Sequence, residues 1–183
     1  MSRLDEARTL LAEADCLFDA ATVANAYDTL AARLDADYAH TLPLILCVMN
    51  GGLYATSEIT QRLQLPFDLD YLHATRYRGA TEGGGLLWKR QPDCVIEGRD
   101  VLVIDDILDE GHTLVAIRQA LLAFKPQSLK VAVLAEKLHD RRAPEAHAEY
   151  IGLSLPDRYV FGCGMDVKEY WRQLPAIYAV KGL

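Results

Sequence analysis

The sequence predicts an α/β fold with a mainly parallel central sheet flanked by helices. Short apolar runs alternate along the chain with amphipathic segments of helical period, which is typical of strand–helix–strand units. Continuous apolar runs indicate strands that are buried on both faces, as they are in a parallel sheet. An acidic turn follows one of these runs, and ligands of such sheets bind at the carboxyl ends of the strands. The length fits one domain that spans residues 1–183.

Two helices are expected at the start of the chain. Apolar side chains recur at helical spacing in two stripes, at Leu4, Ala7, Leu11, Ala14 and Phe18 and then at Val23, Tyr27, Leu30, Leu34 and Tyr38. The first stripe predicts a helix that continues to Phe18. Asp19 or Thr22 is expected to cap the second helix.

Strands and helices alternate in the rest of the chain. Strands are predicted at the apolar residues 42–49, 67–77, 101–104, 129–136 and 150–155, and helices at the amphipathic residues 53–63 and 112–124. Residues 78–93, RGATEGGGLLWKRQPD, hold four glycines and show no period. We therefore expect a mobile surface loop there, of the kind that often forms a lid over a site.

Composition and charge narrow the class of protein. Hydrophobic residues make up 51% of the chain and charged residues 25%, which is an ordinary globular balance. The net charge of −7 disfavours a nucleic-acid partner, because such partners need a basic face. The four cysteines are widely spaced, which predicts reduced thiols and a cytoplasmic protein. No apolar run is long enough to cross a bilayer, so no membrane partner is expected.

The stretch VLVIDDILDEGHTL, residues 101–114, places four acids within six residues directly behind an apolar run. Four like charges repel one another unless a cation or a polyhydroxyl ligand offsets them. The ordinary interpretation is a solvated turn whose acids cap a helix. A second interpretation is the acid pair that binds magnesium in signalling receiver domains. That pair lies near the start of its domain, whereas about a hundred residues precede it here.

A third interpretation is a phosphate cradle with acids beside it. Gly111 permits close approach of the backbone, and Thr113 adds a hydroxyl near a helix N-terminus, where peptide N–H groups point at an anion. Asp105 and Asp106 can then accept hydrogen bonds from ribose hydroxyls or bind magnesium. The chain has no G-x-x-x-x-G-K-[ST] motif, so ATP hydrolysis of that type is not supported. The combination suits a ligand that carries a sugar diol and a phosphate.

The stretch resembles the phosphoribosyl-pyrophosphate signature of type I phosphoribosyltransferases. Three more segments are similar to the hypoxanthine-guanine branch of that family: residues 47–52 (CVMNGG), 134–138 (LAEKL) and 155–174 (LPDRYVFGCGMDVKEYWRQL). The glycine-rich residues 76–86 are similar to the family's mobile catalytic loop. The resemblance implies one phosphoribosyltransferase domain over residues 1–183, with a small base-binding hood built from the terminal segments.

The resemblance also implies an activity and a set of site residues. The activity is transfer of the phosphoribosyl group to hypoxanthine or guanine, which gives IMP or GMP and releases pyrophosphate. The residues implied to bind phosphoribosyl pyrophosphate are Asp105, Asp106, Asp109, Glu110, Gly111, His112, Thr113, Asn50, Gly51 and Arg172. Those implied to bind the purine are Lys137, Tyr159 and Val160, and those implied to bind Mg²⁺ are Asp166 and Asp105. Asp109 is the implied catalytic residue, as proton acceptor at the purine ring.

The purine-binding residue types fit that ligand on chemical grounds. A lysine ammonium only donates hydrogen bonds, so Lys137 suits the carbonyl O6 of a 6-oxopurine. The same ammonium would face the amino group of adenine without an acceptor, which costs binding. Tyr159 offers a flat face to the base.

Two positions depart from the family's pattern. Glu110 stands where the family often has a hydroxyl residue, and Asn50 stands where it often has a basic residue. Two unit charges about 4 Å apart repel by roughly 4 kcal/mol at an effective dielectric constant of about 20. The carboxylate of Glu110 is therefore expected to turn away from the phosphate, toward solvent or a basic side chain.

Two alternatives to this activity stay open at the level of sequence. One is an enzyme that prefers xanthine, because the sequence does not fix what surrounds the purine 2-position. The other is a nucleotide-sensing regulator with a phosphoribosyltransferase fold. Apolar residues near the N-terminus favour a homo-oligomer, either a dimer or a tetramer.

Overall fold

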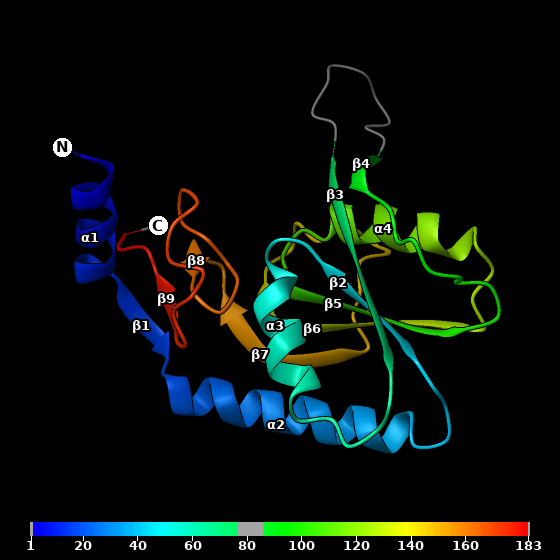
Figure 1. The fold of residues 1–183 in the computed structure, drawn as a ribbon. Helices are drawn as coiled ribbons and strands as arrows, with labels where there is room; N and C mark the ends of the chain where they lie inside the picture. The colour runs from blue at the N-terminus through cyan, green and yellow to red at the C-terminus, as the bar shows by residue number, and fades with distance from the viewer. Residues whose placement is uncertain (1, 77–85, 183) are drawn as a thin grey trace.

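The computed structural model describes residues 2–76 and 86–182 (Figure 1). Its elements follow the order α1 (Arg3–Glu13), β1 (Asp15–Phe18), α2 (Ala20–Asp37), β2 (Leu44–Val48), α3 (Gly52–Thr60), β3 (Asp68–Arg76), β4 (Leu86–Arg90), β5 (Asp100–Leu108), α4 (His112–Leu122), β6 (Ser128–Leu138), β7 (Tyr150–Pro156), β8 (Val160–Phe161) and β9 (Ile177–Ala179). Within these residues no helix combines the length and the apolar character that spanning a membrane requires.

The main sheet has the strand order β4-β3-β2-β5-β6-β7 among the described residues. β3, β2, β5, β6 and β7 run parallel, and β4 pairs antiparallel with β3 at one edge. The central strand β2 is buried along its whole length, as a continuous apolar run predicts. The predicted fold class, a mainly parallel sheet flanked by helices, is confirmed.

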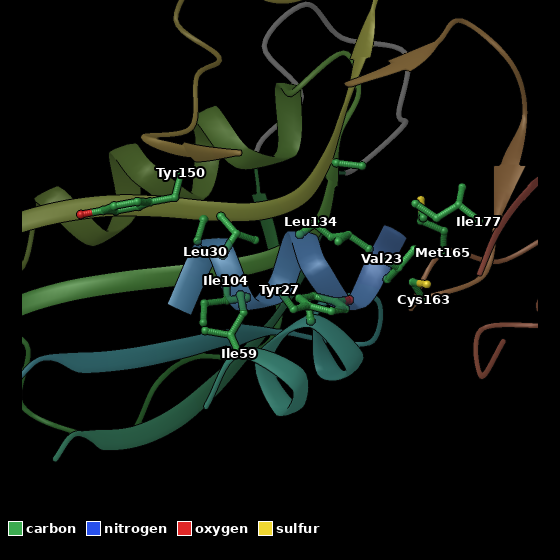
Figure 2. Close-up of a cluster of buried hydrophobic side chains, with 14 of the residues drawn as sticks. Val23, Tyr27, Leu30, Ile59, Ile104, Leu134, Tyr150, Cys163, Met165 and Ile177 are labelled. Carbon is green, nitrogen blue, oxygen red and sulfur yellow. The ribbon is translucent and has the colours of Figure 1, made fainter. Parts of the chain in front are cut away.

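Helices cover both faces of this sheet and create two hydrophobic cores. Helices α2 and α3 pack on one face, where Leu30 and Ile59 meet Ile104 and Leu134 (Figure 2). Helix α4 covers the opposite face with Leu114, Ile117 and Leu121. Residues next to each other in a strand point to opposite faces, so β5 supplies Ile104 to the first core and Val103 to the second.

A small second sheet joins the two terminal segments, with the order β1-β9-β8 in the described chain. β1 and β8 both pair antiparallel with β9, which places the N- and C-terminal segments side by side (Figure 1). Cys163, Met165 and Ile177 from this region extend the first core beyond the end of the main sheet (Figure 2). This small sheet is the hood that the sequence resemblance implies.

The predicted start of the second helix is correct, whereas the predicted end of the first helix is wrong. Asp19 caps α2 by accepting a hydrogen bond from the Thr22 N–H, 2.8 Å away. The helix predicted to reach Phe18 ends at Glu13 instead, and Asp15–Phe18 form β1. The helical spacing is misleading there because pairing with β9 decides the conformation of the segment.

Two further predictions are corrected by the main sheet. Residues 78–93 are not all loop, since Leu86–Arg90 form β4, and the Arg90 guanidinium stacks 3.8 Å from the centroid of the Tyr71 ring on β3. Residues 91–93 of the predicted mobile loop form neither helix nor strand, and its residues 78–85 lie outside the described residues. The strand predicted at residues 101–104 continues to Leu108, so Asp105 and Asp106 belong to β5 rather than to the turn after it.

Substitution of Leu30 tests the first core. Leu30 is fully buried at 0% exposure, and Leu30→Ala leaves a cavity between α2 and the sheet. We expect the free energy of unfolding to fall by about 2–5 kcal/mol in a denaturant titration. The matched control is Leu4→Ala on the 57% exposed face of α1, which should change it by less than about 0.5 kcal/mol. Equal losses in the two variants would contradict this assignment of the core.

Candidate active site

The candidate site lies at the carboxyl ends of β5 and β6. The two strands pair in parallel, and Leu108 is the register partner of Glu136. Asp109, the first residue after β5, and Lys137, near the end of β6, follow this pair and therefore meet at the same edge of the sheet. The Lys137 Nζ donates a hydrogen bond to Asp109 Oδ2 at 2.7 Å, and the lysine side chain is only 11% exposed.

Asp109 has a second basic neighbour. Its Oδ1 lies 2.8 Å from Nε2 of His139, whose side chain is 2% exposed. Burial alone would raise the pKa of Asp109, but the hydrogen bonds from Lys137 and His139 outweigh it and hold that pKa below its ordinary value. Asp109 is thus an ionised carboxylate held from two sides.

The acid pair Asp105 and Asp106 occupies the end of β5 in a contrasting environment. Burial raises the pKa of Asp105 well above its ordinary value, and the charge of Asp106 adds to that effect. Burial also raises the pKa of Asp106, while the nearby Arg172 acts in the opposite direction. Keeping both carboxylates ionised therefore costs stability, and groups that donate hydrogen bonds or carry positive charge would offset this cost.

Three glycines allow the backbone to pack tightly around residues 104–106 of β5. A Cβ at Gly51 would lie 2.1 Å from Asp106 Oδ2, and a Cβ at Gly52 would lie 2.6 Å from the Ile104 carbonyl oxygen. Gly164 has a φ of +106°, and a Cβ there would meet the Gly51 carbonyl oxygen at 2.2 Å. The hood, through Gly164, and the turn after β2, through Gly51, therefore close on the same carboxylate.

The turn before Gly51 contains the predicted phosphoribosyl-pyrophosphate residue Asn50. The peptide bond between Met49 and Asn50 is cis, and Asn50 is exposed. Gly51 lies against the acid pair, so this turn borders the same site as β5.

Gly111 forms the start of α4. It adopts a left-handed conformation with φ +77° and precedes His112, the first residue of the helix. The first backbone N–H groups of a helix have no partner within the helix, so His112 and Thr113 present a site for an anion. A Cβ at Gly111 would lie 2.3 Å from the Ala146 Cβ. The glycine is therefore needed for its conformation and for packing against residues 143–146, in addition to any approach of a ligand.

Glu110 is exposed and lies near basic side chains. Its carboxylate oxygens are 3.8 Å from Arg141 Nε and 3.8 Å from His112 Nε2. Arg141 in turn makes two hydrogen bonds to Asp157, of 2.7 and 2.8 Å. This position agrees with the expectation that Glu110 faces a basic side chain.

Asp166 and Arg172 of the hood pair with each other. Arg172 Nη2 lies 2.5 Å from Asp166 Oδ1, and Arg172 Nη1 donates to the Gly164 carbonyl. The remaining oxygen, Asp166 Oδ2, accepts the N–H of Glu169 at 2.8 Å. Each carboxylate oxygen has two lone pairs, so Asp166 keeps capacity for a metal ligand bond.

Metal binding by the protein alone is not indicated. Among residues 2–76 and 86–182, no group of three or more histidine, cysteine or acidic side chains is arranged to hold an ion. Mg²⁺ usually binds proteins through one or two carboxylates together with substrate phosphates and water. Asp105 and Asp166 fit that pattern.

The two remaining purine-binding candidates follow β7. Tyr159 is 43% exposed, and its carbonyl oxygen accepts a hydrogen bond from the Val180 N–H at 2.9 Å. Val160 is buried in β8 and pairs with Ala179. The hood sheet therefore fixes the backbone of this segment while the Tyr159 side chain is left accessible.

The structure brings Asp105, Asp106, Asp109 and Lys137 together at the ends of β5 and β6, with Gly51 packed against Asp106, and it adds residues that the sequence analysis missed. The missed contacts are those of His139, Arg141, Asp157 and Gly164. A signal existed for His139, because it stands two residues after Lys137 at a strand end and alternate residues share a face. The Arg141–Asp157 pair joins segments that are distant in sequence, and no local pattern announces it.

Comparison with known proteins places the chain among related sequences. A family model described as phosphoribosyl transferase domain matches residues 13–169. The hypoxanthine-guanine-xanthine phosphoribosyltransferase of Tritrichomonas foetus is 33% identical over 152 residues, which cover 83% of each chain. The hypoxanthine-guanine phosphoribosyltransferase of Streptococcus thermophilus is 31% identical over 166 residues, which cover 90% of this chain and 92% of the relative.

Solved structures agree with these relatives. A hypoxanthine phosphoribosyltransferase from Staphylococcus aureus superposes with a TM-score of 0.88 at 30% identity, covering 94% of this chain and 95% of the other. A hypoxanthine-guanine phosphoribosyltransferase from Bacillus anthracis superposes with a TM-score of 0.83 at 26% identity, covering 91% and 96%.

Substitution of Gly111 separates the requirement for a left-handed backbone from the requirement for space beside Ala146. Gly98 is also left-handed, with φ +70°, but a Cβ there meets nothing within 4 Å. Gly98→Ala should therefore cost only the backbone strain of about 1–2 kcal/mol. Gly111→Ala should cost more in a thermal or denaturant unfolding experiment, because its Cβ also collides with Ala146. Adding Ala146→Gly to Gly111→Ala should recover the part of the unfolding free energy that the collision removes. Equal losses of unfolding free energy in Gly98→Ala and Gly111→Ala would contradict the packing argument.

The two kinds of aspartate should respond to amide substitution with opposite signs. At pH 7 in chelator, Asp105→Asn removes a charge that burial disfavours, so we expect the free energy of unfolding to rise by about 0.5–2 kcal/mol. Asp109→Asn removes a charge that Lys137 and His139 stabilise, so this substitution should lower the free energy of unfolding. Because the pKa of Asp105 is raised on folding, its gain should shrink as the pH falls toward the unfolded carboxyl pKa near about 4. Thermal unfolding at several pH values measures both effects, and a destabilised Asp105→Asn would overturn this view of the acid pair.

Proposed function

The chain belongs to the phosphoribosyltransferase family, and from this premise we propose that it transfers the 5-phosphoribosyl group from phosphoribosyl pyrophosphate to hypoxanthine or guanine. The products are IMP or GMP and pyrophosphate. One observation carries the choice of a 6-oxopurine: the buried ammonium of Lys137 pairs with Asp109 at the strand end that leads into the α4 N-terminus. A donor for a purine carbonyl and a proton acceptor thus stand together, next to a helix start suited to phosphate.

In this proposal the phosphorylated sugar occupies the region from β5 to α4. The backbone N–H groups of Gly111, His112 and Thr113 bind the 5′-phosphate together with the Thr113 hydroxyl. Asp105 and Asp106 accept hydrogen bonds from the ribose hydroxyls. When the bond from the anomeric carbon to pyrophosphate breaks, positive charge develops on the ribose, and these carboxylates stabilise it.

The purine is held by residues from β6 and from the hood. Lys137 donates to the O6 carbonyl, the Tyr159 ring stacks on the base, and backbone groups of Val160 meet the base edge. Asp109 accepts the proton that the purine ring loses as it bonds to the ribose carbon. A general base of this kind contributes about 10²–10⁴-fold to a rate.

The pyrophosphate end of the substrate is assigned to Asn50, Gly51 and Arg172. Asp166 and Asp105 are the residues that would hold Mg²⁺, which neutralises the negative charge of the leaving group when it is bound. Arg172 already lies beside Asp166 at 2.5 Å, so it can shift between that carboxylate and the pyrophosphate.

A preference for xanthine is the second candidate within the same chemistry. It is supported by the Tritrichomonas foetus relative, whose name includes xanthine. A nucleic-acid-binding regulator is disfavoured by the net charge of −7. We further propose that residues 1–183 act as one phosphoribosyltransferase domain, that the protein is cytoplasmic, and that it forms a dimer or tetramer.

The deciding experiment follows pyrophosphate release with hypoxanthine, guanine, xanthine and adenine, each with phosphoribosyl pyrophosphate and Mg²⁺. We expect turnover with hypoxanthine or guanine, no turnover with adenine, and loss of activity in excess chelator that Mg²⁺ restores. Turnover with xanthine alone would select the second candidate. Absence of turnover with every base would overturn the proposal.

Substitution of Lys137 tests the purine contact. Lys137→Gln replaces an obligate donor with an amide that also accepts, so discrimination against adenine should fall by at least about tenfold in kcat/KM. The matched control is Lys130→Gln on the same strand, where Lys130 pairs with Asp37 and Tyr150 instead. Its discrimination should equal that of the unmodified protein. If Lys137→Gln leaves the ratio of kcat/KM for the 6-oxopurine to kcat/KM for adenine unchanged, Lys137 does not determine purine specificity.

A further inference from the structure

His139 is a buried histidine whose ring bridges two defined partners. Its Nε2 lies 2.8 Å from Asp109 Oδ1, and its Nδ1 lies 3.2 Å from the backbone nitrogen of Arg141. The side chain is only 2% exposed. Nothing in the sequence signature of the active site assigns it a task.

These two contacts fix which ring nitrogen carries the proton. A backbone N–H only donates, so Nδ1 of His139 must be the acceptor of the Arg141 N–H. The ring proton then resides on Nε2, and His139 donates it to Asp109 Oδ1. The hydrogen bond made by one ring nitrogen commonly decides whether the other nitrogen donates or accepts.

The loop that carries His139 is itself held in place. Arg141 makes a two-pronged contact with Asp157, with N–O distances of 2.7 and 2.8 Å. Such paired hydrogen bonds fix geometry more strictly than a single contact does. These hydrogen bonds therefore connect the loop after β6 to the segment before Tyr159. They restrict the position of the loop from which His139 contacts Asp109.

We propose that His139 is a positioning residue, which holds the Asp109 carboxylate in place when Lys137 leaves it to bind the purine carbonyl. This rests on the proposed function. In the structure Lys137 occupies Oδ2 of Asp109 and His139 occupies Oδ1, so the departure of Lys137 exposes Oδ2 to the purine ring. Asp109 lies beyond the end of β5, where strand hydrogen bonds no longer hold it, and the contact with His139 then fixes the orientation of the carboxylate.

Two amide substitutions of His139 form a matched pair. The side-chain nitrogen of glutamine falls near the position of Nε2, whereas that of asparagine falls near Nδ1 and does not reach Asp109. We expect His139→Gln to keep kcat within about threefold of the unmodified protein. His139→Asn should lower kcat by at least about tenfold, or about 1.4 kcal/mol, with the KM for phosphoribosyl pyrophosphate changed by less than about threefold.

A double-mutant cycle shows whether His139 acts through Asp109. In the Asp109→Asn background, His139→Asn should cause no further loss of kcat, because the group that it positions no longer accepts a proton. Additive losses, or equal kcat values for the Gln and Asn variants, would overturn the proposal. Thermal unfolding of each variant identifies a loss of kcat that is caused by misfolding. If a variant does not fold, the proposal is decided by the tautomer of His139 in the unmodified protein.

The tautomer measurement uses the unmodified protein and needs no activity. ¹⁵N NMR of the histidine rings should find His139 with a proton on Nε2 and none on Nδ1. A proton on Nδ1 would overturn the proposal even in an active enzyme. If the proton is on Nε2 but no purine is turned over, the proposed function has failed while the hydrogen-bond assignment stands, so the two failures are distinguishable.

Discussion

The parallel pairing of β5 with β6 is the constraint on which the candidate site depends. The register that sets Leu108 against Glu136 brings the residues that follow them, Asp109 just after β5 and Lys137 in β6, to one edge. A shift of one residue would turn each of these side chains to the opposite face of the sheet. The register is secured by the cores on both faces, so the burial of residues such as Ile104 and Val103 also determines the chemistry at the strand end.

Close backbone packing is the second requirement, and it explains why stability and function oppose each other here. Gly51 and Gly164 let two segments close on Asp106, and the resulting burial raises the pKa of that carboxyl. A more stable protein would place an amide or an apolar side chain at this point. The two acids are retained although burial makes their ionised forms costly, which is common where a site must stabilise charge in its ligand.

Local patterns predicted the parts of the fold that local forces determine. The apolar runs locate the parallel strands, and Asp19, one of two cap candidates with Thr22, is the N-cap of α2. Local patterns miss β1 because it depends on pairing with β9 at the other end of the chain, and they miss β4 because it follows a glycine-rich stretch that shows no period. For the site, the residue types were readable from the sequence, but the pairing of Asp109 with His139 was not, since it depends on the path of the loop after β6.

The acids among residues 105–110 differ in whether basic side chains of the protein offset their charge. Asp109 is compensated by Lys137 and His139, and Glu110 lies near Arg141, so these two acids are balanced by side chains of the protein itself. For Asp105 the charge of Asp106 adds to the effect of burial instead of relieving it. The least compensated carboxyl is therefore that of Asp105 in the acid pair, and not one of those that precede α4. Ligand hydroxyls and a divalent cation suit the acid pair near the end of β5, whereas a phosphate suits the start of α4, so these neighbouring positions match the two chemical parts of a phosphorylated sugar.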